Sequence, residues 1–371
     1  MTTSLRRAAG SLLVVGLSGA ELTNLERAWL KLIRPAGIIL FRRNIQDAKQ
    51  TRTLLAEATA LCAPHSFRCV DVEGGTVDRL RDALAPMPSA QAVMNAAMMT
   101  GKAALIREQG ELVAQGVKAF GFNTTLAPVL DLALAESAVV MGTRVAASTS
   151  AGVVEYARHF LAGLAARGVV GCAKHFPGLG AGTLDSHLET PSIRSSWSQL
   201  WRQDLAPYRE LRDQLPMIMV SHAAYPGTPG KHRPASVSAF WINMVLRKHI
   251  GYRGIIFSDD FEMGGILKFL SMEEAAVATI RAGMDLVEIC HSPDLIMRAY
   301  DALIIEAERS IPFRDLLIVK TRRVARQRAA LLPGELPKAL SLRQFEALRA
   351  KVLRLSEEVN STHTASEEPY A

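Results

Sequence analysis

The chain has 371 residues, of which 49% are hydrophobic and 21% charged, and its formal net charge is +7. This composition is ordinary for a globular protein with a large core, so neither disulfides nor a structural metal are needed for stability. Lys and Arg are spread along the chain without a basic run, which argues against a nucleic-acid-binding protein. No uninterrupted apolar stretch approaches the ~18 residues of a membrane span.

The N-terminal segment has two interpretations. Arg6-Arg7 followed by the largely apolar residues 8–20 has the pattern of a signal peptide. The apolar run is short, however, and the strand count given below needs Leu12–Leu17 as a first strand. We therefore predict a cytoplasmic protein, with secretion as the alternative. Four cysteines without CxxC spacing fit buried thiols in a reducing compartment.

Eight short apolar runs alternate with segments of helical periodicity. The runs are Leu12–Leu17, Gly37–Phe41, Arg68–Val72, Thr125–Leu130, Val169–Ala173, Met217–Val220, Gly254–Ser258 and Asp285–Ile289. The helical segments are Ala20–Ile33, Asp47–Leu61, Gly101–Phe120, Ser150–Arg167, Asp204–Gln214, Ser238–Ile250 and Met272–Ala282. Eight buried strands alternating with helices predict an α/β fold, a TIM-type (β/α)8 barrel, as a single domain over residues 1–332.

An open, doubly wound sheet is the alternative fold. Such a sheet would carry a glycine-rich phosphate loop after its first strand, and Gly16-Leu17-Ser18-Gly19 is a poor match to that loop.

The pattern changes after residue 332, where Pro333-Gly334 and Pro337 interrupt the chain. Apolar residues then recur at helical spacing at Phe345, Leu348, Val352 and Leu355. We expect residues 333–371 to add one amphipathic helix and a disordered polar tail that begins at Asn360.

Chemically useful side chains gather directly after the predicted strands. They are Asp71, Lys174, His175, Ser221, His222 and Asp259. In a (β/α)8 barrel the carboxyl ends of the strands form the catalytic face. The glycine-rich loop after the fifth strand also presents Asp185 and His187, two residues apart. Histidine titrates near neutral pH and a carboxylate can orient it, so we predict that this pair transfers protons.

The acids of the third strand have a functional and a structural interpretation. Asp71 and Glu73 lie beside Gly74-Gly75, where a ligand can approach the backbone. Asp71 is suited to bind sugar hydroxyls, with Arg79 close behind it, whereas either acid could instead cap the next helix. Arg144, on a loop after the fourth strand, is either a ligand-binding donor or an ordinary surface arginine.

Two further pairs of polar residues end buried strands. Lys174 and His175 cost desolvation unless they are paired or functional, and a hydrogen-bonded core histidine is the alternative for His175. Asp259 and Asp260 repel one another, so one should point into the barrel mouth and the other outward. An inward carboxylate that faces Lys and Arg groups would stay ionised and could act as a nucleophile, whereas helix capping is the alternative for the other acid, expected chiefly of Asp260.

Six segments together resemble glycoside hydrolase family 3, specifically its single-domain bacterial N-acetyl-β-D-glucosaminidases of cell-wall recycling. They are residues 37–44 (GIILFRRN), 71–75 (DVEGG), 127–131 (APVLD), 174–178 (KHFPG), 185–187 (DSH) and 254–260 (GIIFSDD), in the family's order. The resemblance implies a retaining mechanism through a covalent glycosyl-enzyme, with no metal and no cofactor. It implies Asp259 as nucleophile, His187 as acid/base and Asp185 as its partner. It also implies a sugar-binding set of Asp71, Arg79, Arg144, Lys174 and His175.

The expected substrate is a small carbohydrate, a terminal β-linked N-acetylglucosamine on a muropeptide of the GlcNAc-β-1,4-anhydroMurNAc type. A histidine acid/base would tolerate the carboxylate of such an aglycone better than a second glutamate. A β-N-acetylglucosaminide phosphorylase and a β-glucosidase on the same scaffold remain alternatives, as does a catalytically silent muropeptide-binding barrel. The chain departs from the family's usual residues at Val72, Thr76, Ala146 and Leu179.

Overall fold

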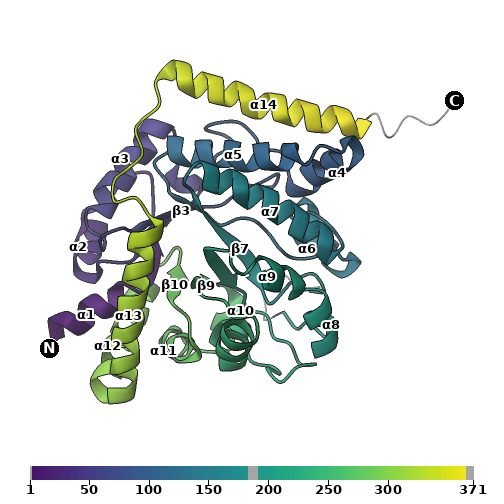
Figure 1. The fold of residues 1–371 in the computed structure, drawn as a ribbon. Helices are drawn as coiled ribbons and strands as arrows, with labels where there is room; N and C mark the ends of the chain where they lie inside the picture. Colours follow the sequence, from purple (N-terminus) through teal and green to yellow (C-terminus); the bar gives the residue numbers. More distant parts are fainter. Residues whose placement is uncertain (1, 183–190, 365–371) are drawn as a thin grey trace.

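The computed structural model describes residues 2–182 and 191–364, and in them eight parallel strands form a closed barrel (Figure 1). The strands, in their order around the barrel, are β1 (Leu13–Gly16), β2 (Gly37–Leu40), β3 (Phe67–Val70), β6 (Thr124–Thr125), β7 (Val170–Phe176), β8 (Met217–Val220), β9 (Ile255–Asp260) and β10 (Leu286–Ile289). The ring closes between β10 and β1, where Val14 is the register partner of Glu288. The predicted (β/α)8 barrel is therefore confirmed, and the doubly wound alternative is excluded.

Helices surround the barrel. They are α1 (Thr2–Gly10), α2 (Asn24–Ile33), α3 (Ala48–Thr59), α4 (Ala90–Thr100), α5 (Ala104–Ala119), α6 (Ala138–Met141), α7 (Ser150–Ala166), α8 (Trp197–Arg202), α9 (Ala206–Leu211), the π-helix η5 (Phe240–His249), α10 (Gly264–Leu267), α11 (Met272–Ala282), α12 (Pro293–Arg309), α13 (Ile311–Leu331) and α14 (Leu342–Thr364). Short 3-10 turns occupy η1 (Arg42–Asn44), η2 (Ala135–Ser137), η3 (Gly142–Arg144) and η4 (Ala235–Val237). Within residues 2–182 and 191–364, each helix is too short or too polar to span a bilayer.

Local sequence signals explain where several helices begin and end. At the start of α2, Thr23 Oγ1 accepts the Glu26 N–H while the Glu26 carboxylate accepts the Thr23 N–H, which satisfies two backbone donors. Ser271 and Glu274 form the same capping box at α11. That helix ends at Gly283, whose φ of 115° is a left-handed conformation that favours glycine.

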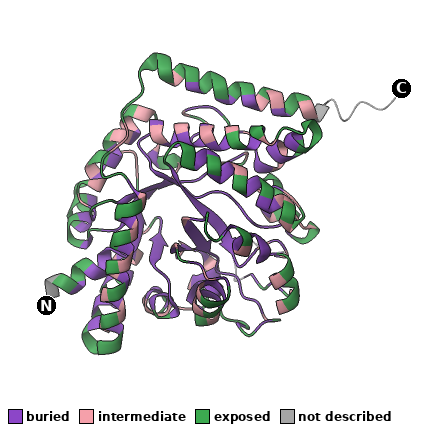
Figure 2. Ribbon diagram, in the orientation of Figure 1, coloured by how far each residue is buried: buried purple, intermediate pink, exposed green. Residues whose placement is uncertain are grey.

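The core lies inside the barrel and between the barrel and its helices. Most strand residues are buried, whereas the helices expose their outer faces (Figure 2). Cys62, Cys69, Cys172 and Cys290 are buried and free, as their apolar context predicts.

Differences from the predicted strand boundaries affect the site at three places. The expected strand Thr125–Leu130 shrinks to β6, because Pro128 cannot donate a ladder hydrogen bond, although the chain still runs beside β7 through Cys172 N–H to Ala127 O. β3 ends at Val70, and Val72–Gly74 forms β4 of a hairpin with β5 (Val77–Asp78). β7 extends to Phe176, so Lys174 and His175 lie within the strand.

The C-terminal helix is confirmed as α14. It packs across α4 and α5, at the top of Figure 1, and buries Leu348, Val352 and Leu355 against them. The expectation of disorder from Asn360 is wrong up to Thr364, because α14 continues through these residues and buries Val359. Residues 365–371 of the expected tail lie outside the described residues.

Candidate active site

A cavity of about 460 Å³ opens at the carboxyl ends of the barrel strands. Six predicted site residues line it: Asp71, Arg79, Arg144, Lys174, His175 and Asp259. They come from different strands and loops, and the closed barrel brings them to one end. The other two predicted residues, Asp185 and His187, lie outside the described residues.

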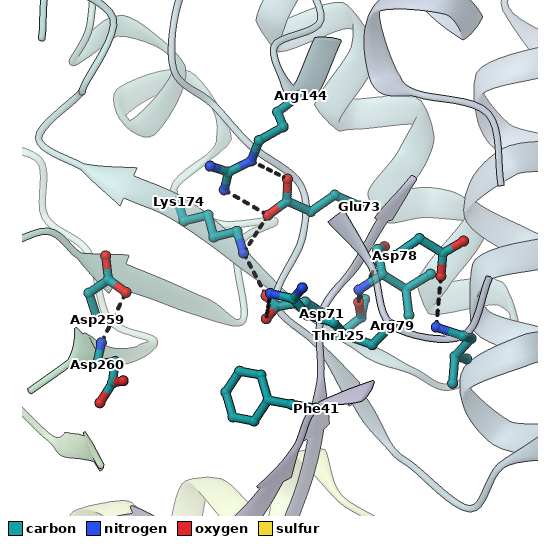
Figure 3. Close-up of polar contacts among 12 residues, drawn as sticks. Phe41, Asp71, Glu73, Asp78, Arg79, Thr125, Arg144, Lys174, Asp259 and Asp260 are labelled. Carbon is teal, nitrogen blue, oxygen red and sulfur yellow. Dashed lines mark hydrogen bonds and ion pairs between the residues drawn. The ribbon is translucent and has the colours of Figure 1, made fainter. Parts of the chain in front are cut away.

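A chain of ion pairs forms one wall of the cavity. The buried Lys174 Nζ lies 2.8 Å from Asp71 Oδ1 and 2.6 Å from Glu73 Oε1. Arg144 donates two hydrogen bonds to the Glu73 carboxylate, from Nε at 2.7 Å and from Nη2 at 2.9 Å. Figure 3 shows this chain on one side of the cavity and the Asp259–Asp260 pair on the other. The charged side chains of this wall are thus held in place by one another and can form hydrogen bonds to a ligand.

The charges in this wall stabilise one another. Burial raises the pKa of Glu73, but the charges and hydrogen bonds of Arg144 and Lys174 outweigh it and lower the pKa to about 2. Burial lowers the pKa of Lys174, while Asp71 and Glu73 raise it more, so the net shift is upward. Glu73 and Lys174 therefore both remain charged at neutral pH.

Glu73 also lines the cavity, and the sequence interpretation left its role undecided. It caps no helix; instead it joins the two cations that face the cavity. The pairing joins residues 71 and 101 positions apart in the chain, which no local pattern reveals. Arg144 is a half-buried partner of Glu73 and not an ordinary surface arginine, with 19% of its side chain exposed.

An aromatic edge completes the Asp71 side of the cavity. Arg79 Nη2 lies 3.6 Å from Asp71 Oδ2. Its guanidinium carbon also lies 5.7 Å from the centroid of the Phe41 ring, and that of Arg43 lies 4.8 Å from the same ring. The other face-to-face partner of Phe41 is the His291 ring, at 5.3 Å. Phe41, Arg79 and His291 thus line the cavity beside the charged wall.

His175 is held by a residue to which the sequence interpretation assigned no role. Its Nδ1 lies 2.7 Å from Oδ2 of Asp131, which also accepts the His175 backbone N–H at 3.2 Å. The other carboxylate oxygen accepts the Leu179 N–H at 2.7 Å, at the start of the loop that leads to residue 183. His175 Nε2 faces Arg144 Nη2 at 3.4 Å. Asp131 therefore couples the ring orientation to the loop.

Asp259 and Asp260 both line the cavity, on its far side. The expectation that Asp260 turns outward to cap a helix is wrong. Its Oδ1 accepts the N–H groups of Glu262 and Cys290, which ties the end of β9 to the end of β10. These two hydrogen bonds hold the Asp260 carboxylate beside β10, at the edge of the cavity. His222, buried behind it, holds the Asp260 carbonyl through Nε2 at 2.9 Å.

The two aspartates differ in charge state. Burial raises the pKa of Asp259, but His175, His222, the Asp260 N–H and Lys174 together lower it below its ordinary value. Burial raises the pKa of Asp260 to about 7, and repulsion from Glu262 and Asp259 contributes. At neutral pH Asp259 is therefore ionised and Asp260 is partly protonated, so a charged carboxylate faces the cavity from Asp259.

Asp260, Glu262 and His291 lie close enough to share a cation, with one ligand atom of each within 4.8 Å of the others. Both carboxylates already have structural partners, however. Glu262 Oε1 accepts the N–H groups of His291 and Ser292, at the start of α12, while Asp260 Oδ1 accepts two others. The cluster therefore joins the end of β9 to the end of β10, and this structural role explains it without a cation.

Of the positions where the chain departs from the family's usual residues, Leu179 lines the cavity, but Val72, Thr76 and Ala146 do not. Val72 instead binds Thr125 Oγ1 through its N–H, at 3.2 Å.

Comparison with known proteins identifies the family of the chain. The model of the glycosyl hydrolase family 3 N-terminal domain matches residues 4–324. A beta-hexosaminidase from Alkalilimnicola ehrlichii is 38% identical over 288 residues, which cover 76% of this chain and 82% of the relative. A beta-hexosaminidase from Neisseria meningitidis serogroup C is 37% identical over 272 residues, which cover 72% of this chain and 74% of the relative.

Solved structures give the same result. A family 3 β-N-acetylglucosaminidase from Paenibacillus superposes with a TM-score of 0.84 at 29% identity, covering 96% of this chain and 68% of that one. NagZ from Neisseria gonorrhoeae, solved in complex with N-trifluoroacetyl-D-glucosamine, superposes with a TM-score of 0.75 at 31% identity, covering 94% and 98%. The chain therefore belongs to glycosyl hydrolase family 3 and is a glycoside hydrolase that acts on O-glycosyl bonds.

Proposed function

We propose that this protein is a retaining β-N-acetylhexosaminidase that releases terminal β-linked N-acetylglucosamine from muropeptides through a covalent glycosyl-enzyme. The observation that carries the proposal is the ionised Asp259 carboxylate, which lines the cavity opposite the wall of Asp71 and Lys174. The relatives named beta-hexosaminidase support the choice of sugar, as does the bound glucosamine derivative in the NagZ structure.

In the proposed mechanism, the wall opposite Asp259 binds the sugar. Asp71 and Glu73 accept from ring hydroxyls, while Lys174, Arg144 and Arg79 donate to them. Asp131 orients the imidazole of His175, whose other nitrogen, Nε2, also belongs to this wall. These fixed, charged partners hold the anomeric carbon in place for attack by Asp259. Because they are already oriented before the reaction, little reorganisation of the protein is needed to reach the transition state.

Two chemical steps follow. Asp259 Oδ attacks the anomeric carbon as the glycosidic C–O bond breaks, and His187 gives its proton to the departing oxygen. His187 then takes a proton from water, whose oxygen attacks the anomeric carbon and releases Asp259. Asp185 orients His187 in both steps. A positioned acid/base of this kind contributes about 10²–10⁴-fold in rate.

One experiment tests nucleophile, mechanism and enzyme class together. The enzyme is incubated with a 2-acetamido-5-fluoro glycoside, digested and analysed by mass spectrometry. We expect a glycosyl adduct on the peptide that contains Asp259 and no adduct in Asp259→Ala. An adduct on another carboxylate would overturn the assignment of Asp259.

Kinetics with aryl glycosides test the substrate. We expect the aryl N-acetyl-β-glucosaminide to be cleaved in preference to the aryl β-glucoside, and both Asp259→Ala and His187→Ala to be nearly inactive. A strong stimulation by phosphate with release of sugar 1-phosphate would show a phosphorylase instead. Release of N-acetylglucosamine from purified muropeptides, followed by chromatography, tests the natural aglycone.

A further inference from the structure

Glu288 is a buried acid of the cavity that the mechanism above does not use. It lies on β10 and lines the cavity together with Asp71, Lys174 and Asp259. Only 2% of the residue is exposed. Its backbone is satisfied, because its N–H donates to Ser258 Oγ and its carbonyl accepts the Phe261 N–H, both at 2.9 Å.

The side chain of Glu288, by contrast, has a buried oxygen without a partner among the described residues. Its Oε1 forms no hydrogen bond within the described residues. Glu73, a glutamate of the same cavity that is buried to a similar degree, is paired with both Arg144 and Lys174. A buried carboxyl without a partner destabilises a fold, so Glu288 is not explained by stability.

The surroundings of Glu288 favour an uncharged carboxyl. Burial raises its pKa well above the ordinary value, and the acids Asp260, Asp71 and Asp259 raise it further, against the opposing effect of Lys174. Asp260 is its register partner on the adjacent strand, so their side chains leave the sheet side by side. A protonated carboxyl can donate one hydrogen bond and accept others.

We infer that Glu288 is a substrate-binding residue whose missing partner is a hydroxyl group of the sugar ring in the cavity. A hydroxyl is suited to this position because it can accept the proton of an uncharged carboxyl and can also donate to Oε1. It needs no counter-charge, whereas Lys174 already pairs with Asp71 and Glu73. The inference rests on the proposed function, since it concerns the sugar that the cavity binds.

The test is a cycle of enzyme variants against substrate analogues. Glu288→Gln keeps the size and the hydrogen-bonding capacity, whereas Glu288→Leu keeps the size and removes it. The substrates are an aryl N-acetyl-β-glucosaminide and its 3-deoxy, 4-deoxy and 6-deoxy analogues. We expect Glu288→Gln to retain kcat/KM within a few-fold and Glu288→Leu to lose about 10- to 100-fold, the effect of one buried hydrogen bond.

The decisive result is the coupling between the two changes. For the wild-type enzyme, kcat/KM should be about 10- to 100-fold lower with one of the deoxy analogues than with the parent substrate. For Glu288→Leu, kcat/KM should be nearly the same with that analogue and with the parent substrate, because both changes remove the same hydrogen bond. If each deoxy analogue lowered kcat/KM by the same factor in Glu288→Leu as in the wild-type enzyme, the inference would be overturned. So would a Glu288→Leu variant as active as wild type.

Two controls distinguish the loss of a sugar contact from a general loss of folding. Glu308→Leu, at an exposed position of α12, should behave as wild type. Thermal unfolding reports folding, and Glu288→Leu should be at least as stable as wild type because it removes an unpaired buried carboxyl. A wild-type enzyme that cleaves no aryl glycoside contradicts the proposed function. An active wild type without coupling at Glu288 contradicts only this inference.

Discussion

His175 Nδ1 and Asp131 Oδ2 lie 2.7 Å apart, although the two residues are 44 positions apart in the chain. Asp131 has a fully buried side chain and makes three contacts, to the His175 ring, the His175 N–H and the Leu179 N–H. One carboxylate thus fixes a cavity side chain and the backbone at Leu179, shortly before the segment that contains Asp185 and His187. Changes at Asp131 should affect binding and the loop together.

Asp131→Asn tests this coupling. The amide keeps the size of the carboxylate but cannot accept at both oxygens, so either the imidazole or a backbone N–H loses its partner. We expect kcat/KM for an aryl N-acetyl-β-glucosaminide to fall about 10- to 100-fold, because small displacements in an active site have effects of this size. Asp47→Asn, which alters the N-cap of α3, is the control and should retain full activity. A normal kcat/KM in Asp131→Asn would contradict the role of Asp131.

Glu73 makes stability depend on pH in the acid range. Its pKa is lowered from 4.5 to about 2, so it contributes stability fully above pH 4.5 and loses this contribution as the pH falls toward 2. The shift corresponds to about 3 kcal/mol. Chemical unfolding of wild type and Glu73→Gln across this range should show a free energy of unfolding that declines more steeply in wild type by about that amount. Parallel curves would show that Glu73 is not held by Arg144 and Lys174.

Asp285 anchors α13 to the barrel. This buried carboxylate binds Arg247 Nη2 and Arg323 Nη1, each at 2.5 Å, and lies 3.5 Å from Lys320 Nζ. Asp285→Ala would leave three cations without their shared partner, so we expect a loss of about 3–5 kcal/mol in the free energy of unfolding. Glu273→Ala, which breaks an exposed pair with Arg298, should cost about 0–1 kcal/mol. Equal effects of the two changes in urea unfolding would contradict the anchoring role.

The helix α14 should contribute to stability and not to catalysis. Leu348 is 4% exposed against α4 and α5, whereas Leu353 on the outer side of the same helix is 40% exposed. Leu348→Ala should lower the free energy of unfolding by about 2–5 kcal/mol, with kcat/KM unchanged. Leu353→Ala is the matched control and should cost much less. A change in kcat/KM with normal stability in Leu348→Ala would show that α14 contributes to the active site.

Much of the fold followed from local patterns. The apolar runs of all eight strands are buried on both faces of a closed sheet, a property that sequence displays directly. The errors lie where context overrides pattern, as at Pro128, which shortens β6, and at Asp260, which pairing with β10 keeps at the cavity. The C-terminal helix followed from its spacing, but its end at Thr364 did not, because burial of Val359 outweighs the polar composition.

The residue types at the strand ends can be read from the sequence, and they were enough to predict the barrel and the family. How these charges pair is visible only in the folded protein. Lys174 lies between Asp71 and Glu73, Arg144 grips Glu73, and Asp131 orients His175, across separations that no local pattern encodes. The Lys174-His175 pair and Asp259 become parts of one cavity because closure of the barrel brings the strand ends together. Burial then sets each charge state, since a carboxylate stays ionised there only when cations or N–H groups surround it.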